Sequence, residues 1–282
     1  MPHSPARPDR QTERTRWTRS ADAWDRWADR MAEPADRMNQ PLLRAVGLAP
    51  GHRLLDLASG TGEPALSAAA LVGADGLVVA TDLVASMLEG TRRRAAQRRT
   101  DALHFSLADM EHLPFAAASF DRVTCRFGLM FAPDAVRAAA EVARVLRPGG
   151  VAGFVVWGPA EENTLFRELA AAVDSVLGPD PEAGMPILFR FAAEGSLAAA
   201  LAEGGLEVTD EQPLRLDHSV PAGRPFWAPT LDMGFAPRLT GEPAERLAAV
   251  RETADQRFRD LAGPDGMVPV RLHARLCIGR KA

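Results

Sequence analysis

The chain has 282 residues, of which 46% are hydrophobic and 25% charged, and its formal net charge is −4. This composition is typical of a globular enzyme and gives no reason to expect a nucleic-acid partner. The chain has two cysteines, which are too few for a disulfide framework. It has no tyrosine, and its single lysine is Lys281, so a phosphate-loop lysine and a tyrosine–lysine proton relay are excluded.

The first 48 residues precede the strand patterns. Residues 1–19 are rich in arginine and have no apolar stretch of the kind found in a secretory signal, so we expect a disordered tail and a cytoplasmic protein. No run of roughly eighteen apolar residues predicts a membrane span. Residues 20–48 predict a helical cover with Trp24, Trp27 and Met31 on one face. That face either packs on the core or covers a ligand, with an indole near the reacting group.

The next segment alternates between short apolar runs and helical patterns. Such alternation is typical of a parallel sheet with helices on both faces, in which ligands bind beyond the carboxyl ends of the strands. The arginines of the second helical pattern predict a solvated face. Strands are expected at 53–58, 77–82, 102–108, 120–128 and 151–158, and helices at 64–72, 84–99 and 133–146.

The rest of the chain continues the sheet and adds an insertion. Residues 221–264 carry several prolines and a charged helical stretch, and they predict a helical lid too short for a core of its own. The fold class is therefore predicted as α/β, a doubly wound and mostly parallel seven-stranded sheet with its core at 49–220 and 265–282. Further helices are expected at 162–177 and 195–205, and strands at 206–220 and 270–281.

The stretch LLDLASGTGEPAL at 54–66 predicts a site where the backbone approaches a ligand. Asp56 lies in the first strand, and the small residues from Ala58 to Gly62 let main-chain amides at a helix start contact a bound group. Roughly twenty residues after this turn, Asp82 ends the second strand, where an acid can accept both hydroxyls of a ribose. Together these features predict an adenosine-containing ligand without deciding which one.

Three later motifs narrow the choice: LADMEHLPF at 107–115, FDRVTCRFG at 120–128 and RVLRPGG at 144–150. With LDLASGTG, and in this order and spacing, they resemble the class I S-adenosylmethionine-dependent methyltransferases. Within that family the sequence is most similar to the ubiquinone/menaquinone biosynthesis methyltransferases and their bacterial natural-product relatives of secondary metabolism. The resemblance implies a Rossmann-like methyltransferase fold and S-adenosyl-L-methionine as cofactor.

The resemblance also implies a role for each matching residue. The turn after the first strand would hold the methionine moiety, Asp82 the ribose, and Asp109 the adenine amino group. The family usually has glycine where this chain has Ala58, and a methyl group is tolerable there if the turn keeps a negative φ. The implied cofactor-binding residues are Asp56, Ala58, Ser59, Gly60, Gly62, Asp82, Leu83, Met87, Asp109, Met110, Cys125 and Arg126.

The acceptor is expected to be a hydrophobic small molecule, quinone-like or a secondary metabolite, because aromatic residues are frequent in the segments around the predicted site. The same aromatics would alternatively attach the insertion to the core. His218, at the end of the sixth strand, is the candidate general base, although a structural role fits it as well. No metal site is predicted. The expected pocket residues are Trp24, Trp27, Phe127, Met130, Phe189, Trp227 and Phe235.

Two other functions use similar cofactor motifs. One is a protein that binds S-adenosylmethionine and steers a reaction without methyl transfer, and the other is a nicotinamide-dependent oxidoreductase. An RNA methyltransferase is disfavoured by the acidic charge balance. The sequence leaves the oligomeric state open, a homodimer included.

Overall fold

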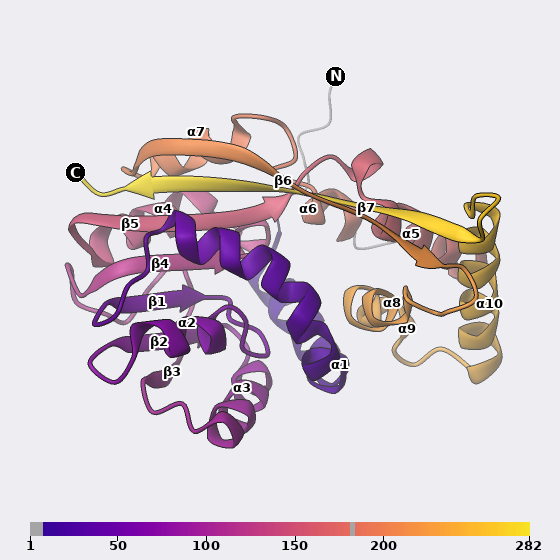
Figure 1. Ribbon diagram of the computed structural model, residues 1–282, viewed down its shortest axis with the longest axis horizontal. Helices are drawn as coiled ribbons and strands as arrows, with labels where there is room; N and C mark the ends of the chain where they lie inside the picture. Colours follow the sequence, from indigo (N-terminus) through magenta and orange to yellow (C-terminus); the bar gives the residue numbers. More distant parts are fainter. Residues whose placement is uncertain (1–7, 181–183) are drawn as a thin grey trace.

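The computed structural model describes residues 8–180 and 184–282. Its centre is a seven-stranded sheet of order β3-β2-β1-β4-β5-β7-β6 (Figure 1). The first five strands are parallel, and β7 runs antiparallel between β5 and β6. The predicted fold class is thereby confirmed. The strands are β1 (Arg53–Leu57), β2 (Leu77–Asp82), β3 (Leu103–Leu107), β4 (Phe120–Arg126), β5 (Leu146–Trp157), β6 (Glu207–Pro221) and β7 (Met267–Arg280).

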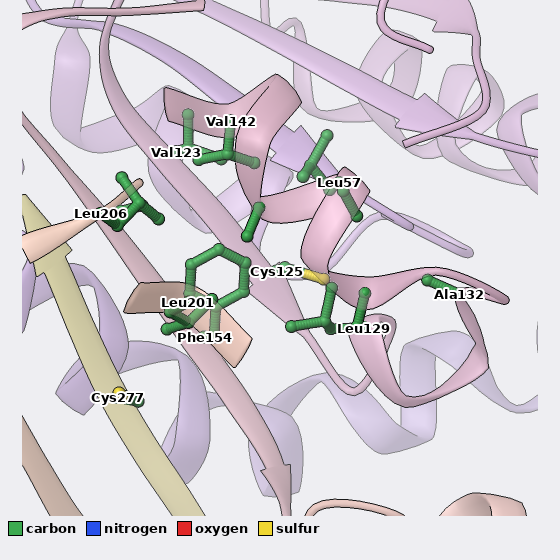
Figure 2. Close-up of a cluster of buried hydrophobic side chains, with 14 of the residues drawn as sticks. Leu57, Val123, Cys125, Leu129, Ala132, Val142, Phe154, Leu201, Leu206 and Cys277 are labelled. Carbon is green, nitrogen blue, oxygen red and sulfur yellow. The ribbon is translucent and has the colours of Figure 1, made fainter. Parts of the chain in front are cut away.

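Helices cover both faces of the sheet, which is why β1 and β2 are almost continuously buried while the edge strand β6 alternates. Helices α4 and α7 bury one face around Phe154 and Cys125 (Figure 2), and α1, α2 and α3 bury the other. The helices are α1 (Arg10–Ala45), α2 (Ala65–Val72), α3 (Ala85–Arg98), α4 (Ala135–Val145), α5 (Thr164–Leu177), α6 (Gly184–Leu188), α7 (Ser196–Glu203), α8 (Ala228–Gly234), α9 (Ala236–Leu239) and α10 (Ala244–Asp260), with short 3-10 turns η1 (Leu129–Phe131) and η2 (Ala160–Glu162).

The N-terminal helix is longer than the sequence predicts. It begins at Arg10, where the Asp9 side chain caps it by accepting from the Thr12 amide at 2.9 Å. The expected disordered tail is therefore wrong for residues 8–19, and residues 1–7 lie outside the described residues. Local composition disfavoured order, but tertiary contacts of the first turns hold the helix to the core, so the helical cover spans 10–45 rather than 20–48.

The insertion between β6 and β7 contains α8, α9 and α10, as the predicted helical stretch implied. The long β6–β7 hairpin reaches past α5 to α10, and α8 and α9 contact α1 (Figure 1). Residues Trp227, Leu231 and Phe258 bury a second apolar cluster together with α5 and the hairpin ends. The insertion thus does share in a core, because α5 and the hairpin supply the area that its own length lacks. Among the described residues, no helix is both long and apolar enough to cross a membrane.

Candidate active site

A cavity lies at the carboxyl ends of β1, β2 and β4 and is covered by α1. It forms at the switch point of the sheet, where β1 and β4 are neighbours and their connections run to opposite sides. The structure brings eleven of the predicted site residues to its wall: Ala58, Ser59, Gly60, Asp82, Leu83, Met87, Asp109, Met110, Arg126, Phe127 and Trp24.

The turn after β1 is fastened to the end of β2. The Ser59 amide donates to the Thr81 carbonyl at 2.8 Å, and the Gly60 amide donates to Asp82 Oδ2 at 3.0 Å. Asp82 Oδ1 also accepts from the Val84 amide at 2.9 Å. Burial raises the pKa of Asp82 to about 6, so this carboxylate is mostly ionised at pH 7 and can accept from ligand hydroxyls.

Ala58 adopts a left-handed conformation with φ of 51°, so the condition under which alanine would replace glycine without strain is not met. Its methyl group is accommodated by Gly128, where an added Cβ would lie 2.5 Å from the Ala58 Cβ. Phe127, also on the cavity wall, has φ of 57°. Two strained residues on one wall are consistent with a backbone shaped for a ligand.

Asp56 and Arg126 lie at the inner end of this turn. Asp56 is fully buried and does not line the cavity, and its Oδ1 accepts from the Thr124 hydroxyl at 2.7 Å. Burial raises the pKa of Asp56 to about 7, partly offset by that hydrogen bond and by the charge of Arg126. Arg126 donates through Nη2 to the Glu63 carbonyl at 3.2 Å, and its Nε is buried without a hydrogen-bond partner among the described residues. A desolvated guanidinium with an open donor is suited to binding an anion.

The loop after β3 is joined to the first turn of α1. Asp109 Oδ2 lies 3.0 Å from Arg10 Nε, and Oδ1 accepts from the Glu111 amide at 2.9 Å. Arg10 Nη2 also donates to the buried Glu111 at 2.8 Å. Asp109, Glu111 and His112 lie close enough to share a cation, but the Arg10 guanidinium already contacts both acids. The cluster is therefore an ion-pair network that fixes Asp109 beside the cavity.

Helix α1 forms the roof of the cavity. Trp17 packs edge-on against Phe131, with ring centroids 4.8 Å apart, and Trp24 lies next to it along the helix. Arg94 of α3 joins this roof helix to the turn after β1, because it donates to the Asp25 carbonyl at 2.6 Å and to the Thr61 carbonyl at 3.3 Å. The expectation of a solvated arginine face is thus wrong for Arg94, which is only 7% exposed. The roof residues are Arg10, Glu13, Trp17, Trp24, Ala28, Met31 and Ala32.

Several predicted site residues do not reach the cavity. The Trp27 indole instead donates to Asp232 on α8 at 2.9 Å. Cys125 is fully buried in the apolar cluster around Phe154 (Figure 2), and burial raises the pKa of its thiol to about 12. Met130 is fully buried in the same cluster. Gly62 is close-packed against Leu66 and does not line the cavity. Phe189, Trp227 and Phe235 pack in the second apolar cluster, as the alternative interpretation of these aromatics expected.

His218 lies in the edge strand β6, paired with Val270, and is not part of the cavity wall. Sequence reasoning missed Arg10, Glu13 and Trp17, all of which line it. Trp17 is spaced seven residues from Trp24, a signal that would have extended the covering face had the tail been treated as helical.

Known proteins with similar sequences and folds indicate what kind of domain forms this cavity. Residues 54–150 match the family model described as a methyltransferase domain. Residues 54–150 carry a methyltransferase domain. The match confirms the family resemblance and S-adenosylmethionine as the cofactor of such a domain. The methyltransferase domain contains the turn after β1, Asp82, Asp109 and Arg126, so most of the cavity floor comes from it.

Individual relatives extend the similarity over part of the chain. A demethylmenaquinone methyltransferase of Beutenbergia cavernae is 42% identical over 154 residues, covering 50% of this chain and 58% of that protein. An uncharacterized protein of Mycobacterium tuberculosis is 44% identical over 116 residues, 41% of each chain. The chain thus spans about half the length of the curated relatives it matches. The solved [4+2]-cyclase SpnF shares the fold, with a TM-score of 0.57, 21% identity and coverage of 87% of this chain and 81% of its own.

Proposed function

We propose that this protein transfers the methyl group of S-adenosylmethionine to a hydrophobic small molecule. One observation carries the proposal: a single cavity joins the motif residues of the methyltransferase domain to an apolar region under α1. That region is lined by Ala28, Met31, Ala32, Phe127 and Met233, which suits a nonpolar acceptor.

The wall fits the cofactor group by group. The Arg126 Nε is an unsatisfied donor that a carboxylate such as that of the methionine moiety would satisfy. Asp82, ionised at pH 7, suits ribose hydroxyls, and Leu83 with Met110 offers apolar cover for an adenine ring. When bound, S-adenosylmethionine would supply an electrophilic methyl group, which a nucleophilic acceptor atom attacks in line with the methyl–sulfur bond, so that S-adenosylhomocysteine leaves as the neutral thioether.

The protein's own contribution is then positioning and exclusion of water. Helix α1 covers the cavity, and the turn after β1 is held by hydrogen bonds to the end of β2, which fixes the backbone that faces the ligand. Among the described residues that line the cavity, none is a histidine, cysteine, lysine or tyrosine. The Glu63 carboxylate already accepts hydrogen bonds from Asn39 at 3.1 Å and from Ser67 at 2.6 Å.

The other carboxylates on this wall are also engaged within the protein: Asp82 with two backbone amides, Asp109 with Arg10, and Glu13 with Arg16. The wall therefore favours an acceptor that is nucleophilic without enzymatic deprotonation, or one that ionises readily in water, such as an acidic phenol, a quinol or an enolisable carbonyl compound. The proposal of His218 as general base loses support, because His218 does not line the cavity. The fold alone does not imply methyl transfer, since the cyclase SpnF shares it. The relatives named as methyltransferases support transfer over the nicotinamide-dependent alternative.

The test is product analysis with purified protein, S-adenosylmethionine and a panel of quinols, phenols and aliphatic alcohols. We expect S-adenosylhomocysteine and a methylated product in equal amounts with a quinol or phenol, and neither with the Asp82→Ala variant. Cofactor binding with acceptor turnover but no S-adenosylhomocysteine would contradict methyl transfer and favour a non-methylating role.

A further inference from the structure

The roof helix carries a hydrogen-bond donor without an acceptor. Trp24 Nε1 is buried and has no hydrogen-bond partner among the described residues, while the side chain lines the cavity. An indole N–H can only donate, and leaving a buried donor unpaired costs roughly 1–3 kcal/mol. An unpaired buried donor in a folded protein needs an explanation, and a ligand that completes its hydrogen bond is one.

A comparison within the chain separates this indole from two others. Trp27 Nε1 has its partner in Asp232, at 2.9 Å. Trp227 Nε1 is also buried without a partner, but it lies in the second apolar cluster and not on the cavity wall. Of these three, Trp24 is therefore the residue that combines an unpaired indole donor with a side chain on the cavity wall.

The neighbours of Trp24 indicate which part of the ligand it meets. Its ring packs in a cluster with Leu83, Val84 and Met87, directly after Asp82 at the end of β2. In the proposed function Asp82 and Leu83 hold ribose and adenine, so this is the adenosine half of the cavity. The Trp17 ring, 6.1 Å from that of Trp24, closes the side toward the Phe131 turn.

We propose that the Trp24 indole N–H donates a hydrogen bond to the adenosine moiety of the cofactor, at a ribose oxygen or an adenine ring nitrogen. Trp24 is then a cofactor-binding residue supplied from outside the methyltransferase domain, and α1 is part of the cofactor site as well as its cover. This inference rests on the proposed function.

The test measures calorimetric binding of S-adenosylhomocysteine and of 5′-methylthioadenosine, which lacks the amino-acid half, to wild type and Trp24→Phe. Loss of one neutral hydrogen bond predicts a Kd about three- to tenfold higher for both ligands. Trp227→Phe is the matched control, because it removes the other unpartnered indole N–H, and both Kd values should stay within about twofold of wild type.

Unchanged affinities in Trp24→Phe would overturn the inference, as would weaker binding of S-adenosylhomocysteine alone, which would move the contact to the methionine half. Failure of wild type to bind S-adenosylhomocysteine would instead overturn the proposed function. If Trp24→Phe does not fold, the indole ¹⁵N–¹H resonances of wild type give the answer. The Trp24 resonance should shift downfield and exchange more slowly with ligand, and an unchanged resonance would refute the contact.

Discussion

Replacing Arg126 by methionine should affect stability and cofactor binding in opposite ways. Within the described residues this guanidinium makes one hydrogen bond, to the Glu63 carbonyl at 3.2 Å, and burial lowers its pKa. Because desolvating a charge offsets most of what so few contacts contribute, Arg126→Met should change the free energy of unfolding by less than about 1 kcal/mol. Binding should suffer more, since a hydrogen bond to a charged group contributes about 1.5–3 kcal/mol, or roughly 10- to 150-fold in Kd.

The assay is urea unfolding of the free protein together with calorimetric titration with S-adenosylhomocysteine. Arg94→Met is the matched control, because Arg94 is a well-paired arginine that joins α1 to the core through Asp25 and Thr61. We expect Arg94→Met to lower the free energy of unfolding by about 1–3 kcal/mol, since it removes the hydrogen bonds of a buried guanidinium to Asp25 and to the Thr61 carbonyl, while Asp25 keeps its ion pair with Arg93. A wild-type Kd in Arg126→Met would refute the assignment of Arg126 to the cofactor carboxylate.

Three further predictions follow from the same contacts. Burial raises the pKa of Asp56 from 3.8 to about 7, so the contribution of its protonated form to the free energy of unfolding is full below pH 4 and is lost as pH rises through 7. Asp56→Asn should therefore flatten the dependence of the free energy of unfolding on pH between pH 4 and 7, and an unchanged slope of that dependence would contradict the burial of Asp56. Gly128→Ala places a Cβ 2.5 Å from that of Ala58 and should lower the free energy of unfolding by about 1–3 kcal/mol, part of which Ala58→Gly in the same chain should restore. Thermal denaturation of the single and double variants measures this, and strictly additive effects of the two substitutions would exclude the contact. Arg10→Gln breaks the contacts to Asp109 and Glu111 and should speed release of S-adenosylhomocysteine about two- to tenfold in stopped-flow tryptophan fluorescence, whereas an unchanged release rate would mean that these ion pairs do not hold the roof closed.

Much of the sheet and the cavity floor could be predicted from local sequence. Strand periodicity and the small residues after β1 place Asp56, the turn and Asp82 at the carboxyl ends of neighbouring strands, and these ends lie side by side because the strands are parallel. The left-handed backbone of Ala58 could not be predicted, since alanine disfavours it and the compensating space comes from Gly128, seventy residues later.

The roof of the cavity depends on long-range contacts, and the sequence did not predict most of it. Arg10 and Arg94 read as solvated charges in a local window, and only the folded chain brings them to Asp109 and Asp25. The sequence also could not separate pocket residues from core residues among the aromatics. Trp227 packs in the second apolar cluster, yet its local sequence pattern is the same as that of a residue that lines a pocket.

Calorimetric titration of wild type and Asp82→Ala with S-adenosylmethionine, S-adenosylhomocysteine and NADH tests the central claim most directly. We predict micromolar-range binding of the first two ligands by wild type, no binding of NADH, and loss of binding in Asp82→Ala. Asp82→Asn, which keeps an acceptor oxygen for the Gly60 amide, controls for loss of the turn and should bind with intermediate affinity. Binding of NADH, or wild-type affinity in Asp82→Ala, would contradict the cofactor site described above.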